Sequence, residues 1–102
     1  MKLLYSAEAK KDLNGIFEYI AQDNPSKAIE FNNYIKKEIV KLIAFPLLGV
    51  SEELPDKIKN KLPNSRKYIL KNYIAHYTIF EQKQILYITK IHNAAMQNYR
   101  LI

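Results

Sequence analysis

Acid–base chemistry in this chain would fall to its two histidines, His76 and His92, because the sequence contains no cysteine. An imidazole titrates near neutral pH, so it can accept and then return a proton within one reaction. A metal-independent ribonuclease would combine such a group with cations that stabilise a pentacovalent phosphate. The side chains available for that work are Arg66, Lys67, His76, His92, Tyr99 and Arg100. The alternative for each histidine is a structural role, as a hydrogen-bonded residue of a half-buried strand.

Other catalytic and cofactor signatures are missing from the sequence. Two glycines cannot form a dinucleotide-binding fingerprint, and the chain contains neither a GxSxG nor an HExxH motif. Two isolated histidines without cysteine do not make a zinc site, so we expect no metal and no cofactor. The single carboxylate pair, Glu52 and Glu53, lies in a loop where adjacent side chains diverge. We therefore expect both of these glutamates to be solvated.

The N-terminal half has the pattern of a helical hairpin. A short apolar run, residues 3–5, precedes Ser6, a good N-cap, and apolar residues then recur at helical spacing as far as Ile20. Asn24 and Pro25 suit the cap and the first position of a second helix. That helix should end at Phe45, because the residue before a proline is displaced from the helical region.

The C-terminal half has the pattern of a small sheet. Residues 49–63 contain a glycine, two prolines and several lysines, which predicts a mobile connecting loop. From Arg66 the period changes to two, and three strands joined by short connections predict an antiparallel meander. The first residues of the chain can add an edge strand. The prediction is one α+β domain over residues 1–102, with element order β-α-α-β-β-β and a helical hairpin packed on a small antiparallel sheet.

The central strand, residues 73–80, presents two different faces. Tyr73, Ala75, Tyr77 and Ile79 make the more apolar register, which predicts the face toward the helices. The other face should be open, apolar and rimmed by lysines, as surfaces that meet a protein partner often are. It consists of Ile74, His76, Thr78 and Phe80.

Charge is distributed unevenly along these 102 residues. Residues 1–56 carry seven lysines against nine acidic residues, whereas residues 57–102 carry nine basic residues against one glutamate. Such an excess favours a polyanionic partner, either nucleic acid or an acidic protein; the alternative is a charge excess that only aids solubility. No apolar run approaches the ~20 residues of a membrane span and the N-terminus lacks an apolar signal core, so we expect a cytoplasmic protein.

With these elements placed, the chain resembles the ParE branch of the RelE/ParE superfamily, the toxins of bacterial type II toxin–antitoxin modules. The resemblance extends over nearly the whole chain, although each motif alone is weak. It rests on Asp12-Leu13, Tyr19-Ile20, Asn24-Pro25, Phe45-Pro46, Gly49, Arg66, Tyr73, Tyr77, Ile91-His92 and Ala94 in that order and spacing. It implies a cognate antitoxin as partner, and one of two targets: DNA gyrase for ParE-type toxins, or mRNA on the ribosome for RelE-type endonucleases.

Departures from the nuclease pattern favour the gyrase target. Ile74 follows the first tyrosine of the central-strand motif where the nucleases have arginine, and Asn93, Ala94 and Ala95 occupy the place of a second arginine. If the chain is a nuclease, we expect Arg66, Lys67, His76, His92 and Tyr99 to carry the reaction. If it binds gyrase, we expect Arg66, Lys67, His92, Tyr99 and Arg100 to contact the target. For the antitoxin we expect Ile74, His76, Thr78 and Phe80.

Two alternatives stay open at the level of the sequence. Many ParE-like chains continue with Arg-Asp after the HxA motif, whereas this one has Ala95-Met96, so the toxin either uses other tail residues or is inactive. A simple basic domain that binds DNA or RNA is the remaining possibility. Its affinity would fall steeply with salt concentration.

Overall fold

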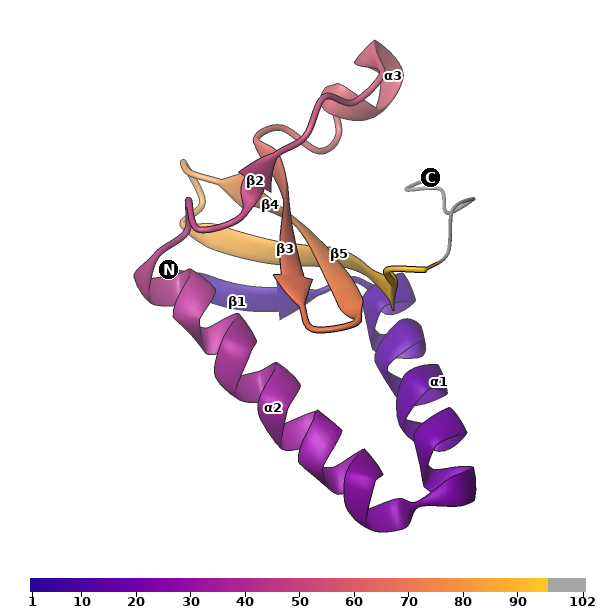
Figure 1. The fold of residues 1–102 in the computed structure, drawn as a ribbon. Helices are drawn as coiled ribbons and strands as arrows, with labels where there is room; N and C mark the ends of the chain where they lie inside the picture. The colour runs from indigo at the N-terminus through magenta and orange to yellow at the C-terminus, as the bar shows by residue number, and fades with distance from the viewer. Residues whose placement is uncertain (96–102) are drawn as a thin grey trace.

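One five-stranded sheet with two long helices on one face makes up the fold (Figure 1). The computed structural model describes residues 1–95. The elements follow one another as β1 (Lys2–Tyr5), α1 (Ala7–Asp23), α2 (Pro25–Ala44), β2 (Val50–Ser51), α3 (Asp56–Lys59), β3 (Ser65–Leu70), β4 (Tyr73–Phe80) and β5 (Ile85–Asn93). The strands lie in the order β1-β5-β4-β3-β2. The α+β class and the helical hairpin are confirmed.

Side-chain caps fix the start of each long helix, as the sequence predicts. The Ser6 hydroxyl accepts from the Ala9 N–H at 2.9 Å and donates to the Thr89 carbonyl of β5 at 2.9 Å. The same side chain therefore begins α1 and fastens it to the sheet. Asn24 caps α2 through the N–H of Lys27, with Pro25 directly after the cap. The second helix ends at Ala44, next to Phe45-Pro46.

The sheet is mixed, and the expectation of a purely antiparallel sheet is wrong for one strand pair. Strands β3, β4 and β5 form the antiparallel meander. Strand β1 pairs with β5 in parallel, with Lys2 opposite Ile85 and Tyr5 opposite Ile88. A parallel pair needs a long crossover connection, and here everything from α1 to the β4–β5 turn supplies it.

Residues 49–63 do not form the loop without secondary structure that the sequence predicts. They include β2, which pairs with β3 at the edge of the sheet, and the one-turn helix α3. Elements of two and four residues are too short to produce a hydrophobic period, which is why the pattern does not signal them.

The core lies between the helices and the face of the sheet that they cover, called here the helix-covered face. Its buried residues are Ala9, Ile35, Ile39, Leu42, Leu70, Ala75, Tyr77, Ile79, Leu86, Ile88 and Ile91. Phe31 and Tyr73 extend it with an edge-on ring contact at 5.1 Å between centroids. The opposite side of the sheet is called the outer face.

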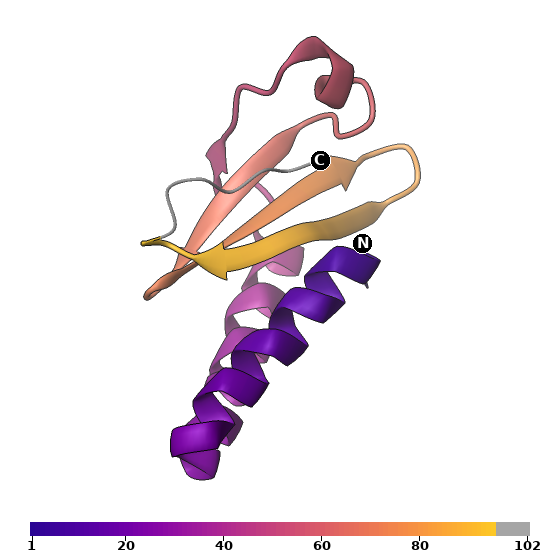
Figure 2. The same ribbon diagram turned by 90° about the vertical axis from the view of Figure 1, so that its right-hand side faces the viewer.

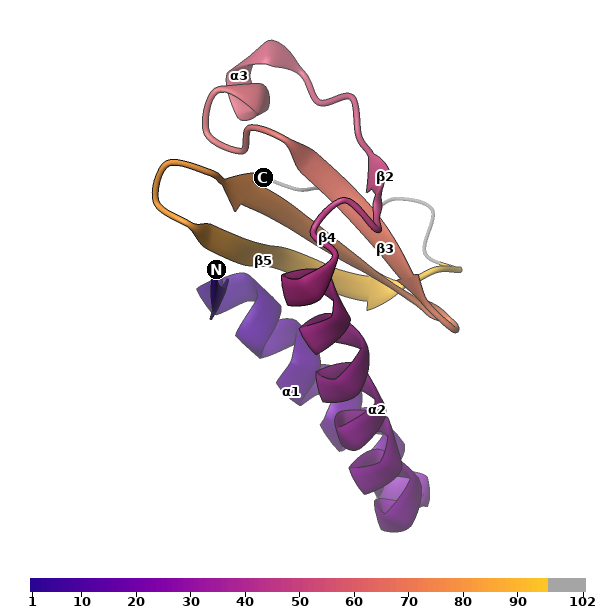
Figure 3. The same ribbon diagram turned by 90° about the vertical axis from the view of Figure 1, so that its left-hand side faces the viewer.

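The helical hairpin extends well beyond the sheet, and the α1–α2 corner and α3 lie at opposite ends of the molecule (Figures 2 and 3). The segment from β2 to α3 therefore adjoins the sheet and not the helical corner. No helix within residues 1–95 is long and apolar enough to cross a membrane.

Candidate functional site

Three side chains from separate elements form a hydrogen-bonded chain on the outer face. Glu52 follows β2, His76 lies in the middle of β4 and His92 lies near the end of β5. A Glu52 carboxylate oxygen lies 2.8 Å from His76 Nδ1, and the Nε2 atoms of the two histidines are 2.8 Å apart. The imidazole rings stack with 5.0 Å between centroids and 16° between planes. We call this set the Glu–His–His chain.

Glu52 is the member that sequence reasoning missed. Its second carboxylate oxygen accepts from the Ser65 hydroxyl of β3 at 3.0 Å, so it is not solvated as expected. Burial acts to raise the pKa of Glu52, but the hydrogen bond and positive charge of His76, aided by Ser65, hold that pKa below its usual value. Glu52 lies 24 residues from His76 along the chain, and no local motif links the two.

Acceptor oxygens lie at both ends of the Glu–His–His chain. His92 Nδ1 lies 3.0 Å from the Asn93 carbonyl, which can only accept a hydrogen bond, as can the Glu52 carboxylate. An acceptor at each end favours the tautomers that place a proton on Nδ1 of each histidine.

The surroundings of His92 disfavour its charged form. Burial lowers the pKa of His92 more than its bond to the Asn93 carbonyl raises it, and the neighbouring His76 and Lys90 lower it further. The side chain of His76 is fully buried and that of His92 nearly so, and each ring nitrogen already has a hydrogen-bond partner. This arrangement ties β2, β4 and β5 together and suits a structural role.

A second cluster holds the turn between α2 and β2, residues 45–50, called the 45–50 turn. The buried Tyr77 hydroxyl donates to the Pro46 carbonyl at 2.6 Å and accepts from the Gly49 N–H at 2.9 Å. The Arg66 guanidinium donates to the Gly49 carbonyl at 2.6 Å and to the Leu47 carbonyl at 3.3 Å. A Cβ on Gly49 would lie 2.7 Å from the Tyr77 ring, so only glycine allows this approach.

Comparison with known proteins gives the family. A family model described as the ParE toxin of the type II toxin–antitoxin system parDE matches residues 3–98. The chain belongs to the ParE toxin family. A chain of the solved structure titled "Chromosomal ParDE TA system from P. aeruginosa" has the same fold, with a TM-score of 0.70 at 21% sequence identity. The alignment covers 91% of this chain and 95% of that one. No curated protein sequence matches the chain closely enough to count as a relative.

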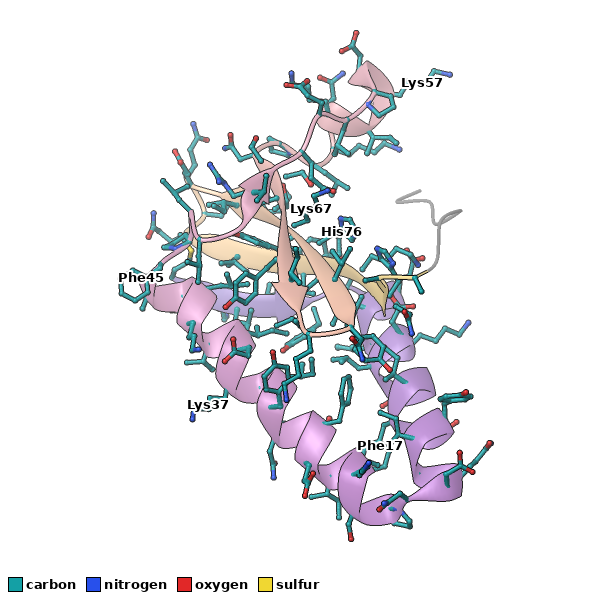
Figure 4. All side chains as sticks on the ribbon, viewed as in Figure 1. Phe17, Lys37, Phe45, Lys57, Lys67 and His76 are labelled. Atoms are coloured by element: carbon teal, nitrogen blue, oxygen red, sulfur yellow. The ribbon has the colours of Figure 1, made fainter. Side chains whose placement is uncertain are left out.

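In this ParE-family toxin the described residues expected to bind a target differ in their surroundings. Arg66 holds the 45–50 turn, and His92 belongs to the Glu–His–His chain. Lys67 is half-buried on β3, opposite His76 of β4 (Figure 4). Tyr99 and Arg100 lie outside the described residues.

The face expected to be open is closed at its centre. His76 and Thr78 are fully buried, and the Thr78 hydroxyl donates to the Pro63 carbonyl of the segment before β3. Ile74 and Phe80 are half-buried. The sequence treats residues 49–63 as a separate loop, whereas the structure places Pro63 against this face. Binding of the antitoxin by these four residues stays a prediction, and only Ile74 and Phe80 keep side-chain surface for it.

Residues 1–95 contain no group of three or more histidine, aspartate and glutamate side chains placed to hold a metal ion. The nearest grouping is the Glu–His–His chain, whose histidine nitrogens bond to one another or to acceptor oxygens. These hydrogen bonds hold the three side chains together.

Proposed function

We propose that this ParE-family toxin inhibits DNA gyrase and that a cognate antitoxin neutralises it. Family membership supports the toxin role, and the engagement of Arg66 favours gyrase over mRNA as the target. A ribonuclease needs a cation that faces the scissile phosphate. One guanidinium nitrogen of Arg66, Nη1, instead donates to two backbone carbonyls and fixes the side chain beside the 45–50 turn. This single observation carries the choice of target.

The two histidines support the same choice. A general base or acid must lie within hydrogen-bond reach of the substrate proton. His76 and His92 are buried and bonded to each other, with Glu52 at one end and the Asn93 carbonyl at the other. Breaking that chain to reach a substrate would leave buried polar groups without these partners, at a cost of roughly 1–3 kcal/mol each.

Lys67 and the tail residues Tyr99 and Arg100 are our candidates for direct contact with gyrase. We assign Arg66 and His92 an indirect part, because their polar atoms hold the fold together. On this proposal residues 1–102 act as one toxin domain, in the cytoplasm where gyrase is found. Long-range attraction from the basic C-terminal half would aid capture of an acidic antitoxin.

A supercoiling reaction tests the target directly. The purified chain is added to gyrase and relaxed plasmid, with and without ATP, and both supercoiled product and cleaved DNA are measured. We expect loss of supercoiling with accumulation of cleaved DNA, and weaker inhibition by a Tyr99→Ala/Arg100→Ala variant. Full gyrase activity in the presence of folded toxin, together with cleavage of translated mRNA that depends on His76 or His92, would overturn the gyrase assignment.

A further inference from the structure

The end of β5 is the point from which the chain enters the tail, residues 96–102. Our tail candidates for contact with gyrase, Tyr99 and Arg100, belong to this segment. His92 is buried, whereas the three residues that follow it, 93–95, are all exposed. Within residues 1–95, His92 is therefore the last hold of the protein interior on the chain before the tail.

The His92 ring is held through both of its nitrogens. Its Nε2 lies 2.8 Å from Nε2 of His76, a fully buried side chain that Glu52 holds in turn. Its Nδ1 lies 3.0 Å from the carbonyl of Asn93, the first of the exposed residues. Hydrogen bonds at both ends of a ring lock the rotamer of the side chain, which restrains the backbone that carries it.

The hydrogen bonds beyond His92 are weaker restraints. The Ala94 N–H donates to the Asn72 carbonyl at 2.7 Å, and the Ala95 N–H donates to the Asn93 side-chain oxygen at 2.8 Å. These four residues are exposed, so water competes for the same groups and each bond contributes little. The bond between the two histidines is buried, so its loss should affect the course of the chain most.

We propose that His92 is a positioning residue for gyrase inhibition, and that its bond to His76 sets the direction in which the chain leaves β5 toward Tyr99 and Arg100. The inference rests on the proposed function, and it assigns His92 a part that needs no contact with gyrase. A segment that already leaves the protein in its binding direction loses less conformational entropy on binding, which strengthens association. Glu52 contributes through His76, because it holds that ring in place.

A pair of spin labels tests the position of the chain without gyrase. The sequence contains no cysteine, so Lys37→Cys on α2 and Ala95→Cys give two exposed labelling sites. Pulsed electron spin resonance measures the distribution of distances between the two labels. We expect His92→Leu to broaden this distribution at least twofold relative to the labelled parent chain. His92→Gln, whose amide can bond to His76, should restore the parent width.

Tyr77→Phe is the matched control for the loss of a buried hydrogen-bonding group. It removes the hydroxyl that bonds to Pro46 and Gly49, on the helix-covered face of β4. This variant should lose folding stability and leave the distance distribution unchanged. His76→Leu breaks the same bond as His92→Leu from the other side and should broaden the distribution equally, which keeps the test decisive if one of the two variants does not fold. Circular dichroism shows which variants are folded.

Gyrase inhibition is then measured with the unlabelled chains. We expect the concentration for half-inhibition to rise at least tenfold for His92→Leu and His76→Leu, and to stay within twofold of wild type for Tyr77→Phe. Rescue by His92→Gln should bring it back to within threefold.

The two measurements separate the inference from the function on which it rests. An unchanged distance distribution in folded His92→Leu, or equal broadening in Tyr77→Phe, would show that His92 does not direct the chain. Broadening without weaker inhibition would show that this direction does not matter for gyrase, and the inference is again wrong. If the wild-type chain leaves gyrase active while His92→Leu still broadens the distribution, the proposed function fails and the hold of His92 on the chain stands.

Discussion

The two faces of the sheet are stabilised in different ways. On the helix-covered face, β4 and β5 contribute aliphatic residues and one tyrosine, all packed against the helices. On the outer face, the same strands bury His76, Thr78 and His92, each with a hydrogen-bond partner. Dispersion and burial tolerate small shifts in position, whereas hydrogen bonds require one geometry. The helix-covered face thus supplies stability, and the outer face fixes where residues 49–63 lie.

The largest expected loss of folding stability comes from shortening a buried side chain on the helix-covered face. Ile88→Ala removes a fully buried side chain beside Tyr77 and should lower the free energy of unfolding by about 2–5 kcal/mol, through lost burial and a new cavity. Urea denaturation at pH 7 measures it, with the exposed Ile29→Ala within about 0.5 kcal/mol of wild type as control. Equal losses at the two sites would contradict the assignment of the core.

Breaking the Glu–His–His chain should cause a smaller loss of folding stability, and this loss should depend on pH. Glu52→Gln removes the carboxylate that bonds to His76 Nδ1 and should lower the free energy of unfolding by about 1–3 kcal/mol at pH 7. The folded-state pKa of Glu52 is lowered, so its contribution is complete above the unfolded pKa of ~4.3 and disappears as pH falls through the folded value. The Glu52→Gln variant should lack this part of the fall in folding stability at acidic pH. Denaturation at several pH values measures it.

Protonation of His92 should also lower the free energy of unfolding as pH falls, in a higher pH range than protonation of Glu52. The folded-state pKa of His92 is also lowered, so the unfolded chain binds the proton first and stability should begin to fall as pH drops below ~6.5. This dependence of stability on the protonation of His92 should remain in the Glu52→Gln variant. Glu53→Gln, one residue away and exposed, is the control and should follow the wild-type curve. A Glu52→Gln profile that matched wild type would contradict the chain of hydrogen bonds.

Tyr77 joins the two regions, because its ring lies in the core while its hydroxyl reaches the 45–50 turn. Gly49→Ala would bring a methyl group to 2.7 Å from that hydroxyl and should cost about 1–3 kcal/mol. Gly15→Ala meets no atom within 4 Å in the middle of α1 and should stabilise the fold by up to about 1 kcal/mol. Thermal unfolding of the pair measures the difference. A stabilising Gly49→Ala would show that the turn has room to move.

Periodicity and caps were enough to predict most of the fold. The apolar stripes of α1 and α2, Ser6, Asn24 and Pro25 define the hairpin because each acts on residues a few positions away. The parallel pairing of β1 with β5 involves residues more than 80 positions apart, and nothing local to either strand encodes it. The same limit applies to β2, which is two residues long and depends on β3.

The site was harder to predict than the fold. The histidines are visible in the sequence, but their bond to each other depends on the β4–β5 register and on the irregularity between His76 and Tyr77. The role of Glu52 depends on how residues 49–63 fold back. The sequence shows Arg66 as a cation. Only the structure shows that its Nη1 donates to two backbone carbonyls.

The pairing of β1 with β5 also has a consequence for synthesis of the toxin. Strand β1, which begins at Lys2, pairs with a strand that begins at Ile85. The Ser6 hydroxyl donates to the Thr89 carbonyl, 83 residues later in the chain. Contacts between the two ends of a chain form late, after the entropy of closing the intervening loop has been lost. While β5 is still inside the ribosome, β1 has no strand to pair with and α1 lacks its tie to the sheet. A nascent chain should therefore carry neither the Glu–His–His chain nor a complete sheet until β5 has left the ribosome.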